Sequence, residues 1–389
     1  MAVPSYGKPR VWPGWQALPV LRMKSTLNPR QADNDRLRGG DAMTDQTAPT
    51  PTGNSPAAAG TEKPADLVLE GGGVKGIGLA GAVLALDQAG YRFHRVAGTS
   101  AGAIAAAIIA ALNKSGKPLS KLQDYLQEVQ FKQFMAKGHL RAALGGLGDA
   151  EHLLLHMGLY DGDYLLDWLG GVLSDIGITH FGDLRLDDPG ADQTWTARQR
   201  YSLVVHVSDI TRGKLVRLPW DYVNYGLDAD HQRIVDAVRA SMSIPFFFEP
   251  VHVRAAAVTA EMADMAAPAG RVTWVDGGML DNYPVDLFDR TDGAPARWQT
   301  IGIKLSAKQT SIGVGHGTDS VASEAIACLQ TVLDNAGRYY VPPDKADRTI
   351  FIDNAGIKAT DFGITEEQQK TLFDNGQKAA REWLAKQKP

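Results

Sequence analysis

The chain of 389 residues holds a single cysteine, Cys328. One thiol cannot form a disulfide within the chain, and a metal site built only from cysteines is excluded. No run of about eighteen uninterrupted apolar residues occurs either, so the sequence predicts no membrane-spanning helix. The apolar stretch at 101–112 is shorter and rich in alanine, which is typical of a buried helix in a globular core.

Neither sign of charge is in excess, because 40 lysine and arginine residues stand against 44 acidic ones, for a net charge of -4. This balance argues against a nucleic-acid-binding surface, which would be strongly basic. The N-terminal part is basic, but prolines interrupt it and no apolar stretch follows that would serve as a secretion signal. These features predict a cytoplasmic protein that binds no nucleic acid.

Residues 1–64 are dominated by Pro, Thr, Ala, Gly and charged residues, without the periodicity of a helix or a strand. A segment of this kind buries too little apolar surface to offset the entropy of ordering it, so we expect a disordered leader. Its basic residues and tryptophans would suit an anionic membrane surface, although a solvated tail is the simpler interpretation. Met43 provides an alternative start, which would leave residues 1–42 untranslated.

From residue 65 onward the pattern alternates between strands and helices. Residues 66–70 predict a strand, the helix that follows ends at Gly90, and 93–99 predict a second strand before the helix at 101–112. Two consecutive βα units favour a central, largely parallel sheet flanked by helices. The sequence therefore predicts one α/β domain over 65–389, with a helical extension at its C-terminal end.

Further elements follow from periodicity and from turn residues. Helical spacing covers 120–135, 161–177 and 228–245, and Pro245 ends the last of these helices. An amphipathic helix begins after Thr365, whose hydroxyl is suited to capping it.

A glycine-rich turn lies between the first strand and its helix, in the sequence LVLEGGGVKGIGLAG at 67–81. Gly71, Gly73 and Gly76 match the spacing of a dinucleotide-binding turn. That function requires an acidic residue about twenty positions further on, at the end of the next strand, to bind the ribose. The strand at 93–99 supplies none, so the sequence argues against nicotinamide binding.

The second strand ends instead in GTSAG, with Ser100 between Gly98 and Gly102. A G-x-S-x-G turn between a strand and a helix is typical of a nucleophile elbow, in which the glycines relieve crowding and leave the serine oxygen exposed. The alternative is a serine that only caps the helix. The position at the strand–helix junction favours the nucleophile.

The glycine-rich turn gains a second interpretation from its place beside this serine. The backbone N–H groups of Gly71, Gly72 and Gly73 would stabilise the oxyanion that forms when a serine attacks an ester. Lys75 adds positive charge to the same loop, and Gly76 completes it. A phosphate-binding loop is the weaker alternative, because the Walker A spacing is absent.

A serine nucleophile needs a base, and Asp276 is the candidate. It ends the predicted strand RVTWV and precedes two glycines, so its carboxylate could reach a neighbouring strand end. Asp281 and Asp286 follow closely in the sequence, and we interpret both as solvated carboxylates of a turn.

Together GGGVKG, GTSAG and DGG resemble the three motifs of the patatin-like phospholipases, in the same order. The resemblance extends over about 66–286, and ASMSIPFFFEPV is similar to the segment that precedes the aspartate in that family. It implies a three-layer α/β fold and hydrolysis of lipid acyl esters by a dyad of Ser100 and Asp276, without a cofactor. Because a carboxylate of ordinary pKa is a weak base for serine, we expect a dry site to strengthen Asp276.

Histidine residues offer alternatives that the sequence leaves open. Ser100, Asp276 and His316 follow the order of the triad in α/β-hydrolases, although that fold places several strands before its elbow. His152 and His156 share one helical face, but no acidic third ligand accompanies them, and we expect no metal.

The acyl pocket is expected at Ile244, Phe246, Phe247 and Phe248, although aromatic residues on a strand more often belong to the hydrophobic core.

A phospholipid or lysophospholipid at a membrane surface fits the resemblance best, which implies a cytoplasmic enzyme that associates transiently with membranes. A water-soluble ester or an acyl thioester is an alternative substrate. A catalytically silent lipid-binding protein is an alternative function, and the intact serine, aspartate and glycine loop argue against it.

Overall fold

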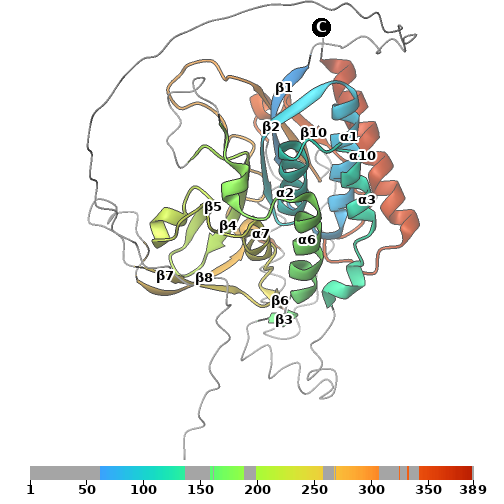
Figure 1. The fold of residues 1–389 in the computed structure, drawn as a ribbon. Coiled ribbons are helices and arrows are strands. Elements are labelled where there is room, and N and C mark those ends of the chain that lie inside the picture. The colour runs from blue at the N-terminus through green and yellow to red at the C-terminus, as the bar shows by residue number, and fades with distance from the viewer. Residues whose placement is uncertain are drawn as a thin grey trace, which may run out of the picture.

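The structure is a computed structural model and describes residues 62–135, 158–160, 162–187, 199–256, 267, 269–305, 324, 331–332 and 341–387. Within these ranges the chain folds around a central sheet that is flanked by helices (Figure 1). Several residues about which the sequence makes predictions lie outside the described ranges: the leader up to residue 61 with Met43, and His152, His156, His316 and Cys328.

The first four elements are those that the sequence predicts, with slightly longer strands. β1 spans Lys63–Leu69, α1 Ile77–Gln88, β2 Tyr91–Thr99 and α2 Ala101–Lys114. β1 and β2 pair in parallel, as two consecutive βα units require. Gly90, just beyond the end of α1, has a φ of 88°, a left-handed conformation that glycine adopts without steric cost.

The sheet has the strand order β10-β9-β1-β2-β4-β8-β7, and β5 pairs with β4 on its other edge. The pairs between β10 and β4 are all parallel, whereas β5, β8 and β7 are held by antiparallel pairs. The prediction of a central, largely parallel sheet is confirmed. The remaining strands are β3 (Gly158–Tyr160), β4 (Leu203–Asp209), β5 (Lys214–Leu218), β6 (Phe246–Phe248), β7 (Val251–Ala255), β8 (Gly270–Asp276), β9 (Gln299–Lys304) and β10 (Thr349–Phe351).

The ends of β2 and β8 meet along one edge of β4. The last residue of β2, Thr99, pairs with His206 of β4, and the next residue of β4, Val207, pairs with Asp276 at the end of β8. β8 runs antiparallel to β4 while β2 runs parallel to it, so the two carboxyl ends point toward one another. This arrangement brings the turn after Thr99 next to Asp276.

Helices cover the sheet, and the C-terminal helix packs along the first one (Figure 1). A Cβ atom on Gly81 would lie 2.0 Å from the carbonyl oxygen of Phe373, and one on Gly376 would lie 2.0 Å from that of Gly78. Only glycine allows backbones to approach so closely. The helices beyond α2 are α3 (Lys121–Gln127), α6 (Asp163–Ile176), α7 (Ile234–Ser241), α9 (Pro343–Ala346) and α10 (Glu366–Lys386).

Two predicted helices are wrong in their extent. The helix expected at 120–135 ends at Gln127, and a separate 3-10 turn follows it. The helix expected at 228–245 begins only at Ile234, because the N–H of Ile234 donates to the carbonyl of Thr179 and holds the preceding residues in a turn. The 3-10 turns are η1 (Gly73–Gly76), η2 (Phe131–Met135), η3 (Phe181–Leu184), η5 (Tyr222–Tyr225) and η7 (Gly277–Met279).

The cap predicted for the last helix is confirmed. The hydroxyl of Thr365 accepts the N–H of Gln368 at 3.2 Å, and the side chain of Gln368 accepts the N–H of Thr365 at 2.9 Å.

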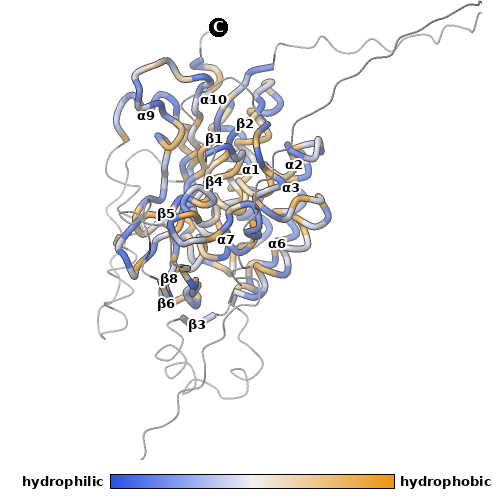
Figure 2. Tube along the Cα trace, turned by 60° about the vertical axis from the view of Figure 1, so that its left-hand side comes forward, coloured by the Kyte–Doolittle hydropathy of each residue, from blue (hydrophilic) through white to orange (hydrophobic). Residues whose placement is uncertain are grey.

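The apolar residues of the chain gather in the interior around the sheet (Figure 2). Among the described residues, no helix combines the length and the hydropathy needed to cross a membrane.

Candidate active site

Ser100 occupies a strained turn between β2 and α2. Its φ and ψ angles are 53° and -123°, outside the regions that a residue with a side chain prefers, and the residue is buried, with 4% of its surface exposed. A Cβ atom on Gly98 would lie 2.2 Å from the carbonyl oxygen of Gly102, and one on Gly102 would lie 2.3 Å from that of Leu69. The two flanking residues are therefore glycine for steric reasons, as the elbow motif predicts.

The backbone of Ser100 is held by Ser241, which lies in the segment ASMSIPFFFEPV but to which the sequence analysis assigns no role. The N–H of Ser100 donates to Oγ of Ser241 at 2.9 Å, and this hydroxyl donates its proton to the carbonyl of His206 at 2.6 Å. Because that proton is committed to His206, Ser241 faces Ser100 with a lone pair. Ser241 lies at the end of α7 and is fully buried. It fixes the turn that presents Ser100.

Asp276 lies beside Ser100 at the end of β8, with only 2% of the residue exposed. Its Oδ1 accepts the N–H of Gly278 at 2.7 Å, whereas Oδ2 is buried and has no hydrogen-bonding partner among the described residues. Burial raises the pKa of the Asp276 carboxyl to about 7, although the N–H of Gly278 and the nearby side chain of Ser100 partly lower it. The structure thus brings together a serine and a carboxylate whose pKa is close to neutral.

The glycine loop lies against the same turn, and one of its N–H groups is already used. Gly71 donates to the carbonyl of Asn282 at 3.1 Å, and its own carbonyl accepts the side-chain amide of Asn282 at 3.1 Å. The prediction that Gly71 contributes an oxyanion donor is therefore wrong. A Cβ atom at Gly71 would come within 3.1 Å of Cβ of Ser100, so this residue instead allows the loop to approach the serine.

Two other residues of the loop remain suited to bind an oxyanion. The N–H groups of Gly72 and Gly73 have no acceptor among the described residues, and the same holds for Ala101, the residue after the serine. Gly73 and Ala101 line the same pocket as Ser100. The sequence analysis missed Ala101, although the elbow motif itself indicates that the residue after the nucleophile supplies an N–H.

The base of the glycine loop is anchored by a buried ion pair. Glu70 pairs with Lys304 at the end of β9, and its second carboxylate oxygen accepts the N–H of Leu305 at 2.5 Å. Lys75 and Gly76 follow in η1, where Gly76 lines the pocket and the alkyl chain of Lys75 packs beside Gly72. The ion pair of Glu70 with Lys304 and the packing of Lys75 beside Gly72 thus hold the loop in place.

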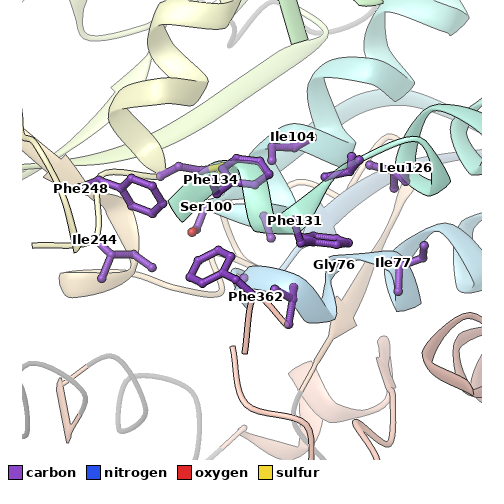
Figure 3. A pocket seen from close by; sticks show the side chains of 15 residues that line it. Gly76, Ile77, Ser100, Ile104, Leu126, Phe131, Phe134, Ile244, Phe248 and Phe362 are labelled. Carbon is purple, nitrogen blue, oxygen red and sulfur yellow. The ribbon is translucent and has the colours of Figure 1, made fainter. Parts of the chain in front are cut away.

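A pocket extends from Ser100 between apolar side chains of several elements (Figure 3). It encloses about 570 Å³ of empty space, including its open mouth. Ile244 and Phe248 line it as predicted, but Phe246 and Phe247 do not, because they pack against the core cluster. Most of the wall comes from residues that the sequence analysis did not identify: Ile77, Ile104, Leu126, Val129, Phe131, Phe134, Met242 and Phe362.

His206, Asp281 and Asp286 lie near the site but outside the pocket. Burial, helped by Arg217, lowers the pKa of His206 to about 3, and its Nδ1 lies 3.8 Å from Asp281. Asp281 is a turn carboxylate as predicted, since its Oδ1 accepts the N–H of Tyr283 at 3.1 Å, but only 33% of its side chain is exposed and burial raises its pKa to about 6. Asp286 is half exposed and pairs with Lys345. No histidine of the described chain lines the pocket.

No metal site accompanies these groups in the described part of the chain, which holds no cluster of three or more His, Cys, Asp and Glu residues suited to an ion. The described residues therefore offer a serine, a carboxylate, free backbone N–H groups and an apolar pocket. This set of groups can transfer an acyl chain from an ester to the serine oxygen and then to water.

Comparisons with known proteins find a matching family model and several similar chains. Residues 67–289 match the family model of the patatin-like phospholipases. The uncharacterized protein YqhO of Bacillus subtilis (strain 168) is 33% identical over 320 residues, which cover 82% of this chain and 97% of that protein. Among solved structures, VipD from Legionella pneumophila is 18% identical with a TM-score of 0.43, covering 84% of this chain and 67% of VipD. The type III effector ExoU is 16% identical with a TM-score of 0.39, covering 83% of this chain and 53% of ExoU.

Proposed function

This chain belongs to the patatin-like phospholipase family, and from that premise we propose that it hydrolyses carboxylic esters of membrane lipids through an acyl-enzyme on Ser100. The observation that carries the proposal is that a strained, buried serine lies beside the buried carboxylate of Asp276. A buried carboxylate without a charged partner is costly, so its presence at this place argues for a chemical role.

The first half of the reaction follows from the positions of these groups. As Oγ of Ser100 attacks the ester carbonyl carbon, its proton passes to Asp276, whose Oδ2 has no other partner among the described residues. The carbonyl oxygen becomes an oxyanion, and the N–H groups of Gly72, Gly73 and Ala101 donate to it. The carbon–oxygen bond of the ester then breaks, and Asp276 returns the proton to the departing alcohol.

The second half repeats the same steps with water. Asp276 removes a proton from a water molecule, which attacks the acyl-enzyme and forms a second oxyanion in the same place. The bond to Oγ breaks, the serine recovers the proton, and the fatty acid leaves. A pKa of about 7 suits Asp276 to both roles, because proton transfer is most efficient when the pKa of the base lies near the working pH.

The pocket supports a lipid as the substrate. Its wall is formed almost entirely by aliphatic and aromatic side chains, which would bind an acyl chain and exclude water from the reacting atoms. We take a phospholipid or lysophospholipid as the substrate, met at a membrane surface by a cytoplasmic enzyme. A soluble ester or acyl thioester would use the same chemistry, and the substrates of the experiment below separate these cases.

The test measures hydrolysis of phospholipid vesicles, lysophospholipid and a short-chain chromogenic ester by wild type, Ser100→Ala and Asp276→Asn. Asp286→Asn is the matched control, because it makes the same change at a half-exposed carboxylate that pairs with Lys345. We expect both active-site variants to lose activity by at least about a thousandfold and the control to keep it. Full activity in Asp276→Asn would overturn the dyad, and a folded but inactive wild type would favour a silent lipid-binding protein.

A further inference from the structure

The segment 354–364, between β10 and α10, reaches the active site although it lies outside the stretch matched by the family model. We propose that this segment completes the acyl pocket and that Phe362 sets a preference for acyl chains long enough to lie along its ring. The proposal rests on the proposed function, since it assigns chain-length specificity to the same site.

The segment is joined to the glycine loop by its backbone. The carbonyl of Ala359 accepts the N–H of Val74 at 3.1 Å. A Cβ atom on Gly73 would lie only 1.9 Å from that carbonyl oxygen, and Gly73 has a φ of 54°. The loop and the segment are therefore in direct contact at a position where only glycine fits. Ala359 helps to hold the N–H group of Gly73 in place.

Contacts at its N-terminal end fix where the segment lies. Just before it, the N–H of Ile352 donates to the carbonyl of Lys304 at 2.8 Å. The side chain of Asn375 in α10 donates to the carbonyl of Asp353 at 2.9 Å. The sheet and the C-terminal helix thus both hold the segment, so that it forms part of the wall as a fixed structure.

Phe362 is the residue of the segment that enters the pocket. Its ring centroid lies 6.2 Å from that of Phe134 and 6.2 Å from that of Phe248, and it meets Phe248 edge to face. In the view of Figure 3, Phe362 and Phe134 lie on either side of Ser100. Only 5% of Phe362 is exposed. It therefore joins two walls of the pocket that come from different parts of the chain.

This position predicts an effect that depends on the length of the acyl chain. A short acyl group has few methylene groups to bury, so it gains little from the pocket wall even though the ring of Phe362 lies close to Ser100. A longer chain buries methylene groups against the pocket wall, and each buried methylene contributes about 0.8 kcal/mol. Removal of the ring should therefore weaken catalysis on long esters more than on short esters.

The experiment compares kcat/KM on p-nitrophenyl dodecanoate and p-nitrophenyl butyrate. We expect the ratio of the two values to fall about tenfold in Phe362→Ala. Phe288→Ala is the matched control, because Phe288 is similarly buried, at 6% exposure, but packs against Trp220 outside the pocket. Its ratio should equal that of the wild type. An unchanged or higher ratio in Phe362→Ala would overturn the proposal.

Phe362→Leu keeps most of the apolar volume and replaces Phe362→Ala in the experiment if the alanine variant does not fold. The same ratio should then fall about threefold.

A binding measurement separates this proposal from the proposed function. Dodecanoate should raise the Tm of wild type and of Ser100→Ala more than that of Phe362→Ala, whether or not esters are hydrolysed. Equal shifts in all three proteins would overturn the role of Phe362, whereas unequal shifts without any hydrolysis would overturn only the enzyme function.

Discussion

The N–H of Ser100 donates to the hydroxyl of Ser241 across 2.9 Å, and this contact holds the proposed nucleophile in a backbone conformation with a φ of 53°. Such a conformation persists only where the surroundings fix it. The hydroxyl of Ser241 acts on the backbone of Ser100, so its effect on the reaction is one of position.

Replacement of Ser241 by alanine should therefore lower kcat by about tenfold to a hundredfold and leave KM nearly unchanged, because the attacking oxygen is misplaced while the pocket stays intact. Ser243→Ala is the control, since Ser243 is also fully buried but its hydroxyl binds Arg239. Steady-state kinetics on the butyrate ester, with thermal unfolding of each variant, measures the effect. Equal losses of kcat in both variants would mean that Ser241 serves the fold alone.

The pKa of Asp276 predicts how activity depends on pH. The proton acceptor must be a carboxylate, and burial raises its pKa to about 7. We expect kcat/KM on a soluble ester to rise with pH, with a single ionisation near 7, and to level off above it. A profile that stays flat between about pH 5 and 8 would contradict the role of Asp276 as the base.

The same pKa predicts that Asp276 lowers the stability of the fold at high pH. The folded-state pKa is raised above the unfolded value of 3.8, so the folded protein holds this proton more tightly and loses stability as the pH rises through about 7. Asp276→Asn should exceed the wild type in stability at pH 8 by on the order of 1–4 kcal/mol, and the difference should shrink as the pH approaches 4. Denaturant unfolding at several pH values measures it, and a variant less stable than wild type at pH 8 would contradict the account.

The glycines of the elbow give a prediction about sterics. Gly102→Ala would place a Cβ atom 2.3 Å from the carbonyl of Leu69 and should cost at least about 2–3 kcal/mol and most of the activity. Gly90→Ala has open space around it and only an unfavourable φ of 88° to overcome, so about 1 kcal/mol should be lost and activity kept. Thermal unfolding and ester hydrolysis of the two variants test this difference.

Local patterns in the sequence predicted the first two βα units, the elbow and the cap at Thr365. Each of these depends on residues that are neighbours in the chain, so the motif and the structure carry the same information. The sequence predicts where the glycine loop lies, but it does not predict which of the loop's N–H groups already donate a hydrogen bond. The hydrogen bond from Gly71 to Asn282 joins residues far apart in sequence, and no local pattern indicates it.

The meeting of Ser100 with Asp276 depends on the topology of the sheet. β2 and β8 pair with successive parts of one edge of β4, and only the pairing of the strands shows that their carboxyl ends meet. The pocket wall is similarly tertiary, because Leu126, Phe134 and Phe362 come from three separate segments. The sequence predicts Phe246 and Phe247 as pocket residues from the stretch SIPFFFEPV, but both are partly buried and pack against the core cluster.

The measurement that tests the central claim most directly is mass spectrometry of the protein after reaction with a fluorophosphonate, which modifies activated serines. The account predicts one added group on the peptide that contains Ser100, no modification in Ser100→Ala, and much slower modification in Asp276→Asn. A wild-type protein that leaves Ser100 unmodified, or an Asp276→Asn variant that reacts at the same rate as the wild type, would contradict a nucleophilic serine activated by this aspartate.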